Sequence, residues 1–165
     1  MRPITIRPAT AADRTFVLST AWELARFDPP EWRRREEIVA GEVRTLEAFF
    51  TAPDEGSALF VAEGPVGEPL GFLFMETVRD YFGGEVHGHV SMIAVMPQAE
   101  GAGVGGALMD AGEEWAASRG FRRVSLNVFE RNRHARAVYE HLGYEPETMR
   151  YVKLLRPGAA RRRRP

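Results

Sequence analysis

A glycine-rich turn between an apolar strand and a helix constrains this chain more than any other stretch of its sequence. Residues 95–108 run from the apolar end of a strand, through a glycine-rich turn, into a helix. The apolar positions of that helix recur at helical spacing, at Val104, Leu108, Ala111 and Trp115. Glycines let another group approach the backbone N–H groups, which lack intrahelical partners at a helix start. The stretch therefore predicts a site for an anion such as a diphosphate, or else a tight turn that binds nothing.

Two common phosphate-binding patterns fail on the residues around these glycines. Gly101, Gly103 and Gly106 satisfy G-x-G-x-x-G, but a dinucleotide site also needs an acid at the end of the next strand. The next predicted strand, residues 123–128, has no acid before Glu130. A P-loop needs Lys and then Ser or Thr after its last glycine, and this chain has two apolar residues there.

A third pattern fits the same residues. The stretch resembles the acetyl-CoA loop of the GNAT family of N-acetyltransferases, V-x-P-x-x-[QR]-x-x-G-x-[GA]-x-x-L. The residues on its defined positions are Val95, Pro97, Gly103, Gly105 and Leu108. Glu100 departs from the pattern, because the family has Gln or Arg there. A carboxylate at this position would repel a pyrophosphate unless its side chain points to solvent.

A second segment, residues 126–144, carries the resemblance further. It follows the family pattern L-x-V-x-x-x-N-x-x-A-x-x-x-Y-x-x-x-G-[FY] at every defined position. Asn132 falls where the N-cap of a helix is expected, and its side chain could serve as the cap alone or also reach a pantetheine amide. Tyr139 falls on the tyrosine that protonates the departing CoA thiolate in this family. The alternative is that Tyr139 belongs to a packed apolar stripe of the helix.

The resemblance implies acetyl-CoA as co-substrate and a set of cofactor contacts. The pyrophosphate would rest on the N–H groups of Gly101, Ala102, Gly103, Val104, Gly105 and Gly106. The pantetheine would lie along the strand at Ile93, Ala94 and Val95 and approach Asn132 and Tyr139. A free N–H of Ile93 or Ala94 would stabilise the oxyanion. Candidate contacts of the 3′-phosphate are Arg131, Arg133 and Arg136.

The general base is predicted from the strand that leads into the glycines. Because side chains alternate along a strand, Glu85, His87, His89 and Ser91 share one face. Counted back from Val95, His89 falls where one branch of the family carries its base. A histidine can deprotonate an ammonium near neutral pH, so His89 is the predicted base, with His87, Glu85 or a water as alternatives. The two histidines could also form a metal pair, but no third ligand is evident, and no metal is predicted.

The order of the predicted elements is that of the GNAT fold. We expect a strand at residues 4–7, helices near 13–25 and 31–50, strands at 57–63, 70–79 and 85–95, a helix from 104, a strand at 124–128, a helix at 132–142, and strands near Tyr144 and at 151–155. The fold class is α/β (mixed α+β), a central twisted, mostly antiparallel sheet of about seven strands with helices on both faces. Residues 1–156 form one domain, and residues 157–165 form a disordered, Arg-rich tail.

Composition narrows the classes of partner. The chain has no cysteine and a net charge of −1, and the tail holds four arginines. The rest of the chain is therefore mildly acidic, which makes a nucleic-acid partner unlikely and suits a cationic substrate. No apolar run is long enough to span a membrane and no signal peptide opens the chain, so we expect a cytoplasmic protein.

These observations predict an N-acetyltransferase that moves an acetyl group to a primary amine of a small molecule or peptide. Possible acceptor contacts are Glu23, Asp28, Glu31, Glu76, Asp80 and Tyr81. The alternatives are a non-catalytic module that binds or senses acyl-CoA, and a nucleotide-binding oxidoreductase. A homodimer is possible.

Overall fold

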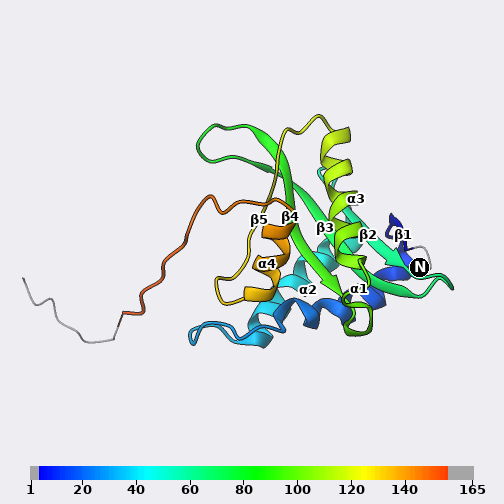
Figure 1. Ribbon diagram of the computed structural model, residues 1–165, viewed down its shortest axis with the longest axis horizontal. Helices are drawn as coiled ribbons and strands as arrows, with labels where there is room; N and C mark the ends of the chain where they lie inside the picture. Colours follow the sequence, from blue (N-terminus) through cyan, green and yellow to red (C-terminus); the bar gives the residue numbers. More distant parts are fainter. Residues whose placement is uncertain (1–3, 156–165) are drawn as a thin grey trace, which may run out of the picture.

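A five-stranded sheet organises the protein (Figure 1). The computed structural model describes residues 4–155 and orders the strands β1-β2-β3-β4-β5. The strands are β1 (Thr5–Pro8), β2 (Ser57–Glu63), β3 (Pro69–Arg79), β4 (Val86–Val95) and β5 (Val124–Leu126). Neighbours from β1 to β4 are antiparallel, and β5 runs parallel to β4. The predicted mixed α+β class and mostly antiparallel sheet are confirmed.

The predicted count of about seven strands is wrong for the described residues. The strands expected near Tyr144 and at residues 151–155 are absent, because residues 144–155 form no helix or strand. A strand needs a hydrogen-bonding partner along its edge. In Figure 1 the segment, coloured orange to red, instead leaves the body of the protein. Its strand-like sequence therefore has no partner strand within residues 4–155.

One face of the sheet is covered by the N-terminal helices. They are η1 (Ala11–Asp13), α1 (Arg14–Thr20), η2 (Ala21–Ala25) and α2 (Arg35–Thr51). The helix predicted over residues 13–25 is thus split into α1 and η2. The second helix starts at Arg35 rather than near residue 31, because Arg34 is still extended at φ −93° and ψ 142°. The buried core on this face includes Val17, Ala21, Val39, Leu46, Phe72, Phe74, Met92 and Ala94.

The opposite face is covered by α3 (Val104–Ser118) and α4 (Arg133–His141). The buried core here includes Leu73, Met75, Val90, Val104, Leu108 and Met109, with Tyr139 and Leu142 of α4 packed against it. Helix α3 lies very close to the sheet: a Cβ on Gly112 would come within 2.7 Å of the Leu73 side chain. This contact holds the middle of α3 against β3.

A bulge interrupts β4 at Ser91. Phe74 lies opposite Met92 and Met75 lies opposite Val90, so Ser91 is an extra residue between the two pairs. As a result, Val90 and Ile93 pack on the α3 side, whereas Met92 packs on the α1 and α2 side.

The described residues, 4–155, cover nearly all of the predicted domain. The single domain predicted over residues 1–156 stays a prediction, and the Arg-rich tail at residues 157–165 lies outside the described residues. Within residues 4–155, no helix has the length and apolar character needed to cross a lipid bilayer.

Candidate active site

The stretch from the end of β4 into the first turn of α3, residues 96–106, is called here the glycine loop. It passes through the short helix η3 (Pro97–Ala99) and takes positive φ at Gly101 (75°) and Gly103 (85°). Such angles favour glycine, and they turn the chain so that α3 begins at Val104. The Val104 side chain is buried at 1% exposure, whereas Ala102 is exposed. Directly before α3, the exposed residues are therefore Gly101, Ala102 and Gly103.

Open space surrounds the glycines of this loop. A Cβ added at Gly101, Gly103 or Gly106 would meet no heavy atom within 4 Å, and one at Gly105 would lie 3.9 Å from Val95. The first N–H groups of a helix have no intrahelical acceptor and carry a partial positive charge. The Ala102 N–H already donates to the Ala99 carbonyl at 3.3 Å. The glycine amides at the start of α3 are of the kind that a pyrophosphate needs, and the residues present fit that group.

Glu100, the residue that departs from the family pattern, is turned toward a cation. Its carboxylate lies 2.6 Å from a guanidinium nitrogen of Arg26, which also contacts Glu23 at 3.2 Å. The Glu100 side chain is half exposed at 49%. Its negative charge is therefore offset by Arg26, and the repulsion expected from the sequence is reduced.

Strands β4 and β5 part beyond the first half of β4. Pairing between them covers only the residues from Gly88 to Val90 on β4. The Met96 N–H donates to the Leu70 carbonyl of the β3 side at 2.8 Å. Along a strand, backbone N–H groups point alternately toward one neighbouring strand and toward the other. The Met96 N–H points toward β3, so the N–H groups of Ile93 and Val95 point away from β3, and that of Ala94 points toward it. The backbone of Ile93 and Val95 therefore lines the gap where β5 has left β4.

Helix α4 brings two predicted residues to the α3 side of this gap. The Asn132 side chain accepts a hydrogen bond from the Ala135 N–H at 3.2 Å, so it is the N-cap of α4. Tyr139 packs in the same apolar cluster as Ile93 and Val95, and its ring lies 6.2 Å from that of Tyr144. Burial raises the pKa of the Tyr139 phenol, which keeps it protonated at neutral pH.

A hydrogen-bonded group of side chains lies on the face of the sheet opposite α3. Its members come from β4, from β5 and from the residue after β5, and we call it the histidine chain: His87, Ser125, His89 and Asn127. The Ser125 hydroxyl lies 2.9 Å from His87 Nε2 and 2.8 Å from His89 Nδ1. The Asn127 amide nitrogen lies 3.4 Å from His89 Nε2. His87 is buried at 6% exposure.

These contacts favour one tautomer of His89. The Asn127 amide nitrogen can only donate, so it faces a lone pair on His89 Nε2. In that arrangement His89 Nδ1–H donates to Ser125, and the Ser125 hydroxyl donates to His87 Nε2. The buried His87 Nδ1 has no hydrogen-bond partner within the described residues. Burial lowers the pKa of His89, partly countered by the charge of Glu76, so the imidazole is neutral near pH 7. A neutral imidazole with a lone pair on Nε2 is the form that a general base requires.

Carboxylates lie beside the histidine chain. Glu76 of β3 pairs with His89 across the strands and accepts a hydrogen bond from the Ser91 hydroxyl. Burial and the charge of Glu76 raise the pKa of Glu42 of α2. This side of the gap therefore carries negative charge next to the imidazole.

The other residues named from the sequence are dispersed. Among them, Asp80 pairs with Arg123 at 3.2 Å, and Tyr81 is 93% exposed in the β3–β4 turn. Asp28 lies 3.9 Å from Arg131, and Arg136 pairs with Glu130. None of these contacts belongs to the histidine chain. Within residues 4–155, no group of three or more His, Cys, Asp or Glu side chains is arranged to hold a metal ion.

Sequence reasoning missed Ser125, Glu42 and Arg26. Ser125 faces the two histidines only because β5 pairs in parallel with β4, a register that the sequence does not reveal. Glu42 interacts with Glu76, and Arg26 pairs with Glu100. Both partners lie far away along the sequence.

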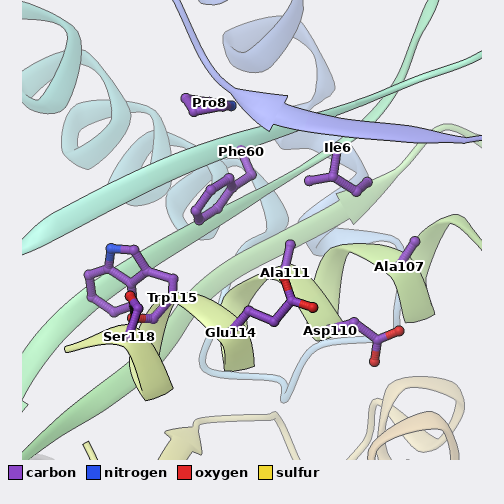
Figure 2. Close-up of a pocket in the computed structure, with 9 residues that line it drawn as sticks. All are labelled: Ile6, Pro8, Phe60, Ala107, Asp110, Ala111, Glu114, Trp115 and Ser118. Carbon is purple, nitrogen blue, oxygen red and sulfur yellow. Dashed lines mark hydrogen bonds between the residues drawn. The ribbon is translucent and has the colours of Figure 1, made fainter. Parts of the chain in front are cut away.

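A separate hollow of about 560 Å³ lies between α3 and the β1–β2 edge (Figure 2). Figure 2 shows Phe60, Ile6 and Trp115 on its walls and Asp110 and Glu114 along α3. None of the predicted site residues lines it.

Comparison with known proteins identifies the family. The profile of the Acetyltransferase (GNAT) family matches residues 18–144. The chain therefore belongs to the Acetyltransferase (GNAT) family. The predicted family is confirmed, and acetyl-CoA is the co-substrate that this family uses.

Individual relatives show how far the likeness extends. The chain is 30% identical over 156 residues to the aminoglycoside N(6')-acetyltransferase type 1 of Stenotrophomonas maltophilia, a match that covers 93% of each chain. It is 37% identical over 112 residues to a mycothiol acetyltransferase of Amycolatopsis mediterranei, covering 66% of this chain and 35% of that protein. The chain thus spans about a third of the length of the mycothiol acetyltransferases that it matches.

Solved structures share the fold. The aminoglycoside N-acetyltransferase AAC(6')-Iy in complex with CoA matches with a TM-score of 0.69 and 21% identity, over 95% of this chain and 97% of that chain. A putative acetyl transferase from Pyrococcus furiosus matches with a TM-score of 0.71 and 24% identity, over 93% of this chain and 100% of that chain.

Proposed function

We propose that the protein transfers the acetyl group of acetyl-CoA to a primary amine of a small molecule or peptide by direct attack. The observation that carries this proposal is the gap between β4 and β5, which has the glycine loop at one end and a neutral imidazole on one face. The backbone of residues 101–106 would hold the pyrophosphate, and Ile93, Ala94 and Val95 would lie beside the pantetheine.

The residues around the gap can divide the proton transfers between them. His89 Nε2 accepts a proton from the acceptor ammonium, and the freed amine attacks the thioester carbonyl. The Ile93 N–H, which points into the gap, donates to the oxyanion in place of the Ala94 N–H, which points toward β3. Tyr139 then protonates the departing thiolate as the carbon–sulfur bond breaks. No cysteine is present to form an acyl-enzyme.

The negative charge beside the base favours a cationic acceptor. Glu76 lies next to His89, and Glu42 lies behind it on α2. A carboxylate close to the base attracts an ammonium group and orients it toward Nε2. We therefore place small polyamines and amino sugars, including aminoglycosides, first among the acceptors to be tried. The relative that matches over 93% of both chains is named for an aminoglycoside.

A ligand screen followed by an assay tests the proposal. Acetyl-CoA and CoA should raise the melting temperature of the protein, and NADP should not. Thiol release should then appear with at least one amine of a panel of polyamines, amino sugars, amino acids and peptides. Stabilisation by acetyl-CoA with no thiol release from any amine would favour the non-catalytic acyl-CoA-binding module. Stabilisation by NADP alone would favour the oxidoreductase.

Replacing Tyr139 tests the proton donor. Tyr139→Phe should lower kcat about 100-fold while the affinity for acetyl-CoA, measured by calorimetry, stays within about twofold. Tyr151→Phe, at an 86% exposed position, is the matched control and should leave both quantities unchanged. Unchanged turnover in Tyr139→Phe would remove this residue from the proposed mechanism.

Two further expectations stay proposals. We propose a cytoplasmic location, which fractionation of the native cells would test. We also propose a homodimer, for which sedimentation velocity of the intact chain is the direct measurement.

A further inference from the structure

The hollow between α3 and the β1–β2 edge carries negative charge that no neighbouring cation balances. Its charged lining residues are Asp110 and Glu114, and no basic side chain lines it (Figure 2). Both are exposed, and within residues 4–155 neither belongs to an ion pair. Glu113 of the same helix, by contrast, accepts a hydrogen bond from Tyr144. The hollow thus offers two carboxylates to a cation.

The C-terminal end of α3 adds to this negative charge. Helix α3 contains three acids and no basic residue, and its last turn lacks the basic side chain that commonly stabilises a helix end. The last carbonyl groups of a helix carry a partial negative charge, which disfavours Glu114 there and favours a cation. Arg119 follows the helix, but its guanidinium lies over the Trp115 ring at 4.7 Å and donates to the Glu55 carbonyl. The place for a cation beside Glu114 is therefore not filled within residues 4–155.

The walls of the hollow suit a long cationic side chain better than a small ion. Ile6, Phe60 and Trp115 line a volume of about 560 Å³, and each is only partly buried. An arginine side chain can cover apolar surface with its stem while its guanidinium pairs with a carboxylate or stacks on an aromatic ring. Asp110 and Glu114 are four positions apart and share one face of α3. Two neighbouring arginines can therefore be held at once.

The chain itself carries a run of arginines that the proposed reaction does not use. Residues 157–165 contain four consecutive arginines, at positions 161–164, and no acid. The other arginine run, residues 33–35, is followed directly by two acids, and its first two members pair with Glu37 and Glu36. The terminal run has no acid in its own stretch. Its charge is complementary to that of the hollow.

The chain that leads to these arginines starts at the helix that borders the hollow. The Tyr144 hydroxyl donates to Glu113 of α3 at 2.9 Å. The seventeen residues from Tyr144 to Arg161 span up to about 56 Å when extended, whereas α3 is only about 22 Å long. Within residues 4–155, no hydrogen bond or ion pair joins residues 145–155 to the rest of the chain, so none holds them in the outward course of Figure 1. The tail is therefore long enough to return to the other flank of α3.

We propose that the arginines at positions 161–164 dock in the hollow of their own chain. Their guanidinium groups pair with Asp110 and Glu114, and their stems cover Phe60 and Trp115. The docked tail neutralises the acidic face of α3 and holds the C-terminal segment across this helix. Because the contact is intramolecular and depends on charge, it forms at any protein concentration and is released when the salt concentration rises.

A spin label at the end of the tail measures this contact in the intact chain. The chain has no cysteine, so Pro165→Cys provides a single thiol for a nitroxide. At low salt the nitroxide should broaden the amide signals of α3 around Asp110 and Glu114, and the signals should recover in 1 M salt, where the Debye length is about 3 Å. The double variant Asp110→Asn, Glu114→Gln keeps the side-chain size and should abolish the broadening. The control pair Glu140→Gln, Glu147→Gln removes two exposed charges outside the hollow and should leave the broadening unchanged.

A mixed sample distinguishes the chain's own tail from that of a second copy. Isotope-labelled chains without nitroxide are mixed with unlabelled chains that carry it, and no broadening should appear. Broadening in this mixture would mean that a second copy supplies the tail. An intact chain without broadening would mean that tail and hollow do not meet, and broadening that survives the double variant would mean that charge does not hold them. Each of these three results overturns the proposal. Acetyl transfer should be unchanged in the double variant, because none of the proposed site residues lines the hollow.

Discussion

The glycine loop and the histidine chain, at two sides of the same gap, are built in opposite ways. The glycine loop is one contiguous stretch that offers backbone amides around open space. The histidine chain is made of side chains from β4, from β5 and from the residue after β5, which meet only when the sheet forms. The first is specified by local sequence, and the second by strand register.

This difference predicts which changes affect which substrate. Backbone amides tolerate side-chain replacement until a new group fills the space or adds charge. A side-chain network loses its chemistry when one member is removed. Substitutions in the histidine chain should therefore lower turnover and spare acetyl-CoA binding, and substitutions in the glycine loop should do the reverse.

The largest effect is expected at His89. His89→Gln removes the base and should lower kcat about 10²- to 10³-fold, with acetyl-CoA affinity unchanged. Because burial lowers the pKa of His89, its neutral, active form persists below the ordinary value of 6.5. The kcat/KM of the natural enzyme should therefore fall only below that pH, and the fall should be absent in His89→Gln. The control is His134→Gln, on the exposed side of α4. A weakened acetyl-CoA affinity in His89→Gln would contradict the expectation that the histidine chain serves turnover and not cofactor binding.

A charge placed in the glycine loop should have the next largest effect. The Cβ of Gly106→Asp enters open space, so the fold should be kept, but its carboxylate would compete with the pyrophosphate for the same amides. We expect acetyl-CoA affinity to fall about 10-fold by calorimetry. The melting temperature should rise slightly, since an acid in the first turn stabilises a helix. Gly106→Ala is the control for side-chain size, because it adds a Cβ without a charge. It should change the affinity for acetyl-CoA less than about threefold.

Removing the hydroxyl of Ser125 sharpens the histidine side of the comparison. Ser125→Ala should lower kcat about fivefold, in line with the loss of about 1 kcal/mol of hydrogen bonding. Without an acceptor for Nδ1–H the protonated imidazole is less stable, so the pKa of His89 falls and the acidic limb of the kcat profile moves to lower pH. Ser125→Thr keeps a hydroxyl and should restore both. An acidic limb that stays in place would show that Ser125 serves packing alone.

The smallest effect concerns Glu100. Arg26→Ala removes the cation beside this carboxylate and should weaken acetyl-CoA binding about threefold at low salt, less at high salt. Adding Glu100→Gln to that variant should restore the affinity. If the single variant binds as the natural protein does, the Glu100 charge does not reach the cofactor.

The sequence allowed the glycine loop, both sets of helices and the first five strands to be predicted, because each has a local signal. It did not allow the histidine chain to be completed. Strict alternation along residues 85–95 puts His89 on the same face as Ile93 and Val95, whereas the bulge at Ser91 places them on opposite sides of the sheet. The sequence pattern of residues 151–155 predicts a strand of the same sheet, but these residues have no partner strand within residues 4–155.

The bulge at Ser91 has a consequence for how β4 tolerates changes in length. Val90 and Met92 would alternate normally if Ser91 were deleted, so every core side chain of β4 would keep its present side. Neither apolar layer depends on the additional residue. A deletion at this position should therefore change the face that carries His89 without repacking the interior.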